Sequence, residues 1–213
     1  MTRLRALVVD FGGVMTDSLE VAMGSWLTAE GIDPDSYRAA MHHFLGPDAD
    51  VEDNPVHALE KGELAVPHFE ERVAPFLRTP DGGPVEATDL LSRMFHAFGR
   101  AEGMHDVVRR VRSAGARTAL LSNSWGLDYP REEWPQLYDV TVISGEVGLR
   151  KPDPEIYHLT AERLGVDPGE CVMVDDLAPN VRGAVAVGMV GVLHRSVAET
   201  VAEIEVLFGL PSR

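Results

Sequence analysis

The chain is poor in cysteine and in lysine. Cys171 is the only cysteine among 213 residues, which excludes an internal disulfide and a cysteine-ligated zinc cluster. It heads an apolar stretch, so we expect a buried small side chain rather than a catalytic thiol. Lysine occurs only at Lys61 and Lys151, so 17 of the 19 basic residues are arginine. A lysine in this chain is therefore a candidate for a tight anion site, where a compact ammonium and a planar guanidinium are not interchangeable.

The chain also lacks positive charge and long apolar runs. Its 19 basic residues face 34 acidic ones, a formal net charge of −15, which disfavours binding to nucleic acid and to anionic lipid. The longest apolar run, residues 183–193, is far shorter than the ~20 residues of a membrane-spanning helix. The first ten residues indicate a buried strand rather than a signal peptide. We therefore expect a cytoplasmic protein without nucleic-acid or membrane partners.

An alternation of strand and helix begins near residue 104. Apolar runs separated by helical patterns predict strands at residues 118–121, 140–143, 171–174 and 190–192. Continuously apolar strands that alternate with helices indicate a parallel sheet covered on both faces. Together with a first strand at residues 4–9, the pattern predicts an α/β fold with a Rossmann-like sheet of five parallel strands.

Residues 17–103 have a different character. Seven prolines punctuate this stretch, and none of its apolar patterns is convincingly that of a strand. Helical patterns are found at residues 19–30, 35–44, 56–61, 66–76 and 87–98. We interpret residues 17–103 as a helical cap domain inserted into a core domain of residues 1–16 and 104–213.

Polar side chains follow three of the predicted strands. Asp10 follows the first, Ser122 and Asn123 end the second, and Asp175 and Asp176 end the fourth. The carboxyl ends of parallel strands meet at one edge of the sheet, where ligands bind. Three carboxylates there would repel one another and raise their own pKa values unless a cation lies among them. Oxygen ligands in this number suit Mg²⁺.

Lys151 lies in a loop before a predicted helix, within the segment Arg-Lys-Pro-Asp-Pro. It would bring a second positive charge to the same edge of the sheet. A surface position is the alternative, which its rarity and the rigid segment after it disfavour.

Four segments resemble the four motifs of the haloacid dehalogenase (HAD) superfamily in their order and spacing. They are residues 10–14 (DFGGV), 121–123 (LSN), 151–154 (KPDP) and 174–180 (VDDLAPN). The resemblance covers the whole chain, with the insertion in the place of that family's helical cap. Residues 58–64 (ALEKGEL) add a narrower resemblance, to the phosphatases related to the N-terminal domain of soluble epoxide hydrolase.

The resemblance implies a nucleophile and a metal site. Asp10 would attack phosphorus and form an aspartyl-phosphate that water hydrolyses. Asp176 would bind Mg²⁺ directly, beside an oxygen of Asp10 and the backbone carbonyl of Gly12. Asp175 would hold metal-bound water or Lys151.

The resemblance also implies a phosphate-binding set. Its members would be Gly12, Gly13, Ser122, the Asn123 amide and Lys151. Lys151 would neutralise charge on the nucleophile and the phosphoryl group, because positioning and electrostatics dominate phosphoryl transfer. Asn180 is expected to brace the motif loop by hydrogen bonds.

One departure from the family pattern concerns the proton donor. Many HAD phosphatases carry a second Asp two residues after the nucleophile, and this chain has Gly12 there. A general acid contributes roughly 10²- to 10⁴-fold. We therefore expect a slow enzyme, a substrate with a good leaving group, or a donor from elsewhere. The candidates are Asp17, whose ordinary explanation is capping of the first cap helix, and the pair His42 and His43, whose ordinary explanation is solvent exposure.

The expected function is a Mg²⁺-dependent phosphatase of a small phosphorylated metabolite, as a monomer or a homodimer. A metal-independent haloacid-type dehalogenase is one alternative, because Gly12 allows it. A weakly active phosphometabolite-binding protein is another, because every phosphate and metal ligand of the motifs is retained while the acid is missing.

Overall fold

The structure, a computed structural model, describes residues 3–46, 54–126 and 128–211. Its centre is a five-stranded sheet in the order β3-β2-β1-β4-β5, and all of these pairings are parallel. The α/β fold and the five strands expected from the sequence are thus confirmed. The strands are β1 (Ala6–Val9), β2 (Arg117–Ser122), β3 (Val140–Ile143), β4 (Cys171–Asp175) and β5 (Val190–Leu193).

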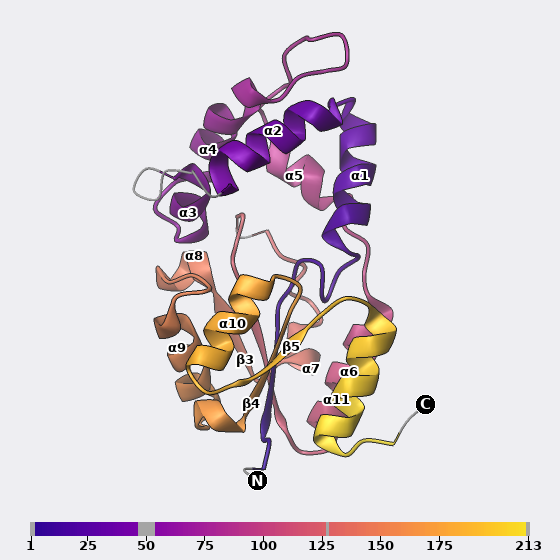
Figure 1. Cartoon of the computed structure of the whole chain (residues 1–213), viewed down its shortest axis with the longest axis vertical. Coiled ribbons are helices and arrows are strands. Elements are labelled where there is room, and N and C mark those ends of the chain that lie inside the picture. Colours follow the sequence, from indigo (N-terminus) through magenta and orange to yellow (C-terminus); the bar gives the residue numbers. More distant parts are fainter. Residues whose placement is uncertain (1–2, 47–53, 127, 212–213) are drawn as a thin grey trace.

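Helices cover both faces of the sheet (Figure 1). Leu7 and Val9 pack in one hydrophobic cluster with α6, α7 and α11, whereas Ala6 and Val8 pack in another with α9 and α10. Successive side chains of a strand point to opposite faces, so a strand covered on both sides is apolar throughout. These helices and two short neighbours are α6 (Glu102–Ser113), α7 (Trp134–Leu137), α8 (Ser144–Val147), α9 (Pro154–Leu164), η2 (Pro168–Glu170), α10 (Ala178–Ala186) and α11 (Val197–Phe208).

A layer of short helices lies beyond the carboxyl ends of the strands (Figure 1). It has a hydrophobic cluster of its own, in which Trp26, Phe44, Phe69 and Leu90 are buried. The five helical segments expected here are confirmed, while the division of the chain into core and cap domains stays a prediction. The elements of this helical layer are α1 (Leu19–Glu30), α2 (Pro34–Leu45), α3 (Pro55–Glu60), α4 (Val66–Val73), η1 (Ala74–Phe76) and α5 (Leu90–Phe95).

Local chemistry sets where these helices begin. Ser18, Asp33 and Asn54 cap α1, α2 and α3, each accepting a hydrogen bond from a backbone N–H of the first turn. Capping by Asp17 was therefore the wrong explanation for that residue. The helix expected from residue 87 begins only at α5, because Asp89 has a left-handed backbone with φ of 57°.

The two crossings between the layers lie side by side. Thr16 forms an antiparallel bridge with Arg100, and the backbone N–H of Asp17 donates to the Gly99 carbonyl at 3.0 Å. Within the described ranges, every helix is too short or too polar to cross a bilayer.

Candidate active site

Three carboxylates meet at the carboxyl edge of the sheet. Asp10 directly follows β1, Asp175 is the last residue of β4, and Asp176 comes next. One oxygen from each lies within 4.8 Å of one from each of the others. The backbone N–H of Asp10 donates to the carbonyl of Val174 at 2.9 Å, which continues the β1–β4 ladder up to the cluster. Strand register therefore brings together the three acids that the sequence placed at this edge.

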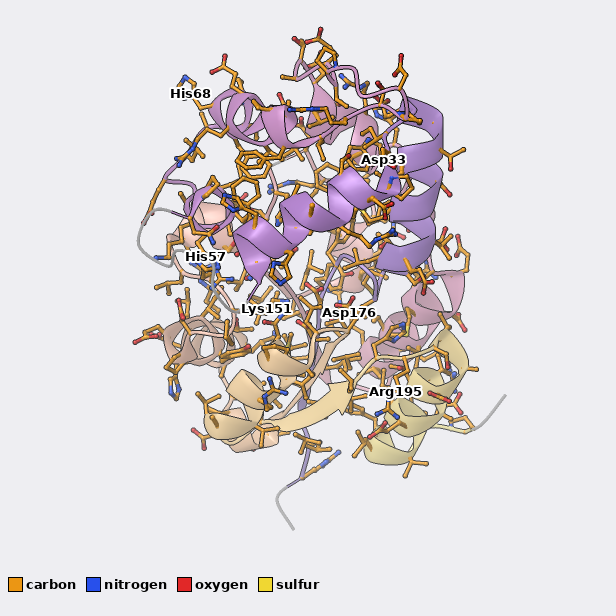
Figure 2. The ribbon with its side chains drawn as sticks, turned by 45° about the horizontal axis from the view of Figure 1, so that its top comes forward. Asp33, His57, His68, Lys151, Asp176 and Arg195 are labelled. Carbon is orange, nitrogen blue, oxygen red and sulfur yellow. The ribbon has the colours of Figure 1, made fainter. Side chains whose placement is uncertain are left out.

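Lys151 enters the cluster from the loop before α9. Its Nζ lies 2.7 Å from Oδ1 of Asp10 and 2.6 Å from Oδ2 of Asp175, and its side chain is 1% exposed. Figure 2 shows Lys151 and Asp176 where the sheet meets the helical layer. The chain thus buries one of its two lysines as a bridge between two carboxylates.

The side chain of Asn123 holds the Lys151 loop. Its Oδ1 accepts from the Lys151 backbone N–H at 2.8 Å, and its Nδ2 donates to the Lys151 carbonyl at 2.9 Å. These two bonds tie the side-chain amide to the loop, so the phosphate contact expected from the sequence falls to the backbone N–H of Asn123.

Asp175 is fully buried and held from three directions. Besides Lys151, its carboxylate accepts from the backbone N–H of Leu177 at 2.9 Å and from Nδ2 of Asn180 at 3.0 Å. The Tyr157 hydroxyl donates to the Asn180 carbonyl at 2.7 Å. Asn180 therefore braces the motif loop, as the sequence analysis expected.

Burial and crowding set the protonation of the acids. Burial raises the pKa of Asp10 to about 7, because the favourable effect of Lys151 only partly offsets it and Asp175 and Asp176 add repulsion. Burial and then Asp175 raise the pKa of Asp176 to about 6. Burial opposes the charge of Lys151, but Asp10 and Asp175 raise its pKa above the ordinary value. One ammonium thus faces three carboxylates, which leaves an excess of negative charge.

The donor set fits a hard divalent cation. Oδ1 of Asp176 is buried and has no hydrogen-bond partner within the described ranges, and buried polar atoms of this kind ordinarily have one. Carboxylate oxygens are the ligands that Mg²⁺ prefers. Asp10 and Asp176 would hold such an ion, while Asp175 is occupied by its protein partners.

Gly12 and Gly13 differ in whether a Cβ atom would fit at their positions. Gly13 has φ of 75°, and a Cβ atom there would lie 2.5 Å from Oδ2 of Asp176. Only glycine allows that approach. A Cβ atom at Gly12 would meet Leu19 Cδ2 at 3.7 Å, an ordinary contact. Packing therefore permits a Cβ atom at position 12.

Ser122 has a partner that the sequence analysis did not identify. Its Oγ lies 3.0 Å from the hydroxyl of Tyr129, and the Tyr129 ring packs edge-on against Phe11 with centroids 5.0 Å apart. Tyr129 is outside the four motifs, and no spacing rule connects it with Ser122. Its position depends on the loop between β2 and α7.

A cavity of about 750 Å³ lies between the two layers; Asp10, Lys151, Asp175 and Asp176 are not among its lining residues, and it approaches their cluster through Phe11. Phe11, next to the nucleophile, and Tyr129, next to Ser122, line it. Aromatic side chains from both layers complete much of its wall, including Trp125, Trp134, Tyr138, Phe95 and Phe98. Ligand pockets typically have this size and apolar character.

The alternative proton donors suggested by the sequence are exposed. The carboxylate of Asp17 lies against Gly99, at the crossing between the layers. His42 and His43 are exposed on α2, where the ring of His43 stacks on Phe76 with centroids 4.8 Å apart. The contacts of these side chains thus give no support for a role at Asp10.

A buried contact joins α3 to the Lys151 loop. Glu60 is 7% exposed, and its carboxylate accepts from Nε of Arg150 at 2.6 Å and from Nε1 of Trp125 at 3.3 Å. Gly62 has φ of 73°, and a Cβ atom there would lie 2.5 Å from the carbonyl oxygen of Gly145. The segment of residues 58–64 therefore docks the helical layer onto the loops of the core.

Sequence relatives include phosphatases and longer proteins. The chain is 28% identical over 196 residues to Phosphatase MT3486 of Mycobacterium tuberculosis, covering 88% of this chain and 77% of that protein. It is 27% identical over 212 residues to mouse Acyl-CoA dehydrogenase family member 10, covering 97% of this chain. The chain spans only 19% of that longer protein.

Solved structures share the fold. A HAD family enzyme from Bacteroides thetaiotaomicron, in complex with magnesium and inorganic phosphate, has a TM-score of 0.65 at 19% identity over 90% of this chain and 94% of its own. A structure described as a dehalogenase with an intermediate complex has a TM-score of 0.67 at 19% identity over the whole of both chains.

The family model for haloacid dehalogenase-like hydrolases matches residues 4–188. This match includes β1, the helical layer, Lys151 and the acids that end β4. The chain therefore belongs to the haloacid dehalogenase-like hydrolase family.

Proposed function

We propose that the protein is a Mg²⁺-dependent phosphatase that acts on a small phosphorylated metabolite through an aspartyl-phosphate. The observation that carries this proposal is the buried cluster of Asp10, Asp175 and Asp176. Lys151 bridges it on one side, and on the other an Asp176 oxygen has no hydrogen-bond partner among the described residues. A nucleophilic carboxylate, a fixed ammonium and a cation site are what phosphoryl transfer needs.

Each side chain has a defined task in this reaction. Asp10 supplies the attacking carboxylate oxygen, and Lys151 holds that carboxylate while it compensates the phosphoryl charge. Ser122 donates its hydroxyl to a phosphoryl oxygen. Bound Mg²⁺ supplies Lewis-acid stabilisation of the charge on the phosphoryl group.

The comparisons support the phosphatase hypothesis. A relative that covers most of this chain is named a phosphatase, and a HAD family enzyme of the same fold holds magnesium and inorganic phosphate. A role as a weakly active phosphometabolite-binding protein would need the same residues and differs only in turnover.

A dehalogenase is the second candidate, because Gly12 lacks the second carboxylate and a neighbouring structure is described as a dehalogenase. The unpaired charge argues against it. Asp176 beside Asp10 and Asp175 would repel the carboxylate of a haloacid substrate in the absence of a cation.

The test is release of inorganic phosphate from a panel of phosphate monoesters. We expect activity that EDTA abolishes and Mg²⁺ restores, and that Asp10→Ala eliminates. Halide release from 2-haloacids that persists in EDTA would establish the dehalogenase instead. Tight binding of beryllofluoride without turnover on any ester would establish the binding protein.

A further inference from the structure

The chain lacks an acid at position 12, and among the described residues the hydroxyl of Tyr129 is placed to replace it. We propose that Tyr129 is the general acid that protonates the leaving oxygen of the substrate. This inference rests on the proposed phosphatase function. Tyr129 lies outside the sequence motifs, and no other step of the proposed reaction uses it.

The hydroxyl of Tyr129 lies at the phosphate side of the site. It is 3.0 Å from Oγ of Ser122, the side chain proposed to hold a phosphoryl oxygen. The leaving oxygen is bonded to the same phosphorus as that phosphoryl oxygen. A donor within hydrogen-bond distance of Ser122 therefore lies close to the oxygens bonded to that phosphorus. The leaving oxygen is one of them, and it must come within about 2.6–3.2 Å of its acid.

The ring of Tyr129 lies on the alcohol side of the site, because it lines the 750 Å³ cavity. The phosphoryl group would lie at Asp10 and Ser122, and the cavity reaches toward them through Phe11 and Tyr129, so it offers space for the alcohol. The leaving oxygen joins these two parts of a monoester. Tyr129 therefore spans the junction at which the bond breaks.

The Tyr129 ring is fixed by its neighbours. It packs edge-on against Phe11 at 5.0 Å and against Trp134 at 5.4 Å, and the guanidinium of Arg131 lies 5.9 Å from its centroid. Burial raises the pKa of its hydroxyl above the ordinary value. The ring is therefore held in one place and its hydroxyl carries its proton at neutral pH. When Ser122 donates its own proton to a phosphoryl oxygen, the Tyr129 O–H turns from Oγ of Ser122 to the leaving oxygen.

His105 is the strongest competing donor in the cavity wall, and its hydrogen bonding argues against it. Its Nε2 lies 3.0 Å from the carbonyl oxygen of Met15, so the ring proton of the neutral form is on Nε2. Burial lowers the pKa of His105. Its Nδ1, which has no partner within the described ranges, is then an acceptor rather than a donor.

The first half of the proposed reaction is attack by Asp10 and departure of the alcohol. The Asp10 oxygen forms a bond to phosphorus as the bond from phosphorus to the leaving oxygen breaks. The proton of the Tyr129 hydroxyl moves to that oxygen, and the alcohol departs. Water then hydrolyses the aspartyl-phosphate and returns a proton to the phenolate, which restores Tyr129.

The experiment compares two esters of similar shape, 4-nitrophenyl phosphate and 4-nitrobenzyl phosphate. The first leaves as a stable phenolate and the second as a basic alkoxide that needs a proton. We expect Tyr129→Phe to lower kcat/KM for the benzyl ester by roughly 10²-fold and to change that for the phenyl ester only slightly. Tyr138→Phe removes a hydroxyl from the same cavity wall and should not separate the two esters.

Restoring the lost activity of the Tyr129→Phe variant is a second test. A Cβ atom at position 12 would make only an ordinary contact, with Leu19, so Gly12→Asp in the Tyr129→Phe background should restore turnover of the benzyl ester. In the unaltered protein, a solvent deuterium isotope effect on kcat/KM is expected for the benzyl ester and not for the phenyl ester. This measurement needs no variant that has to fold.

The outcomes separate the two proposals. Absence of phosphate release from these two esters and from every other ester of the panel would overturn the phosphatase function itself. An active enzyme in which Tyr129→Phe lowers both esters equally would show that Tyr129 only positions Ser122, and would overturn this inference alone. Absence of an isotope effect with the benzyl ester would also overturn it.

Discussion

At the scale of single residues, the site depends on the choice of lysine at position 151. Nζ of Lys151 lies within 2.7 Å of two carboxylates, in a place that leaves the side chain 1% exposed. A guanidinium is larger and planar, so it cannot occupy the same point between Asp10 and Asp175 without moving one of them. The scarcity of lysine in the sequence was a usable signal for this residue.

Replacing Lys151 by arginine keeps the positive charge and changes the shape of the charged group, so it shows which of the two the site requires. We expect Lys151→Arg to lower kcat/KM for phosphate release by roughly 10²-fold or more, the scale of losing one fixed electrostatic contact. Lys61→Arg, at the other lysine, is the matched control and should keep full activity. Lys151→Arg with activity within a few-fold of the original would refute the need for an ammonium at this point.

At the scale of elements, sequence patterning identified the strands and most helices but not how the layers dock. The apolar and helical patterns are local signals, and the structure follows them in β1 to β5 and in α1 to α3, although the cap of α1 is Ser18 rather than Asp17. The contacts of Glu60 with Arg150 and Trp125 join residues 90 and 65 positions apart. No local rule could predict them, and the same holds for Tyr129 at Ser122.

The Glu60 contact gives a prediction for stability. Arg150 and Glu60 are 17% and 10% exposed, and removing one partner of a buried ion pair leaves an uncompensated charge. Glu60→Ala should lower the free energy of unfolding by about 3 kcal/mol in chemical denaturation. Glu63→Ala, an exposed glutamate of the same segment, should change it by about 0.5 kcal/mol or less. Equal effects of the two changes would contradict the docking role.

At the scale of the whole molecule, two layers with separate hydrophobic clusters enclose the site. The crowded acids are a cost to folding that the rest of the molecule must offset, because burial raises the pKa of Asp176 from 3.8 to about 6. An acid with a raised pKa binds its proton more tightly when folded. The carboxyl of Asp176 therefore destabilises the folded state least at low pH. Its contribution to the free energy of unfolding declines as pH rises through the folded pKa.

Asp176→Asn isolates this contribution. In EDTA, the variant should gain stability relative to the original protein as the pH rises from about 4 to about 7, and the difference should level off above that range. Thermal melts across pH measure it. A difference that is independent of pH would show that the carboxylate carries no such cost.

Trapping the phosphorylated enzyme is the decisive test of Asp10 as the nucleophile. The protein is incubated with a phosphate monoester and Mg²⁺, quenched in acid and digested, and its peptides are analysed by mass spectrometry. We predict one phosphoryl group on the peptide that contains Asp10, absent in EDTA and absent in Asp10→Asn. Steady phosphate release with no label on that peptide, or with the label on another residue, would contradict the assignment of Asp10 as the nucleophile.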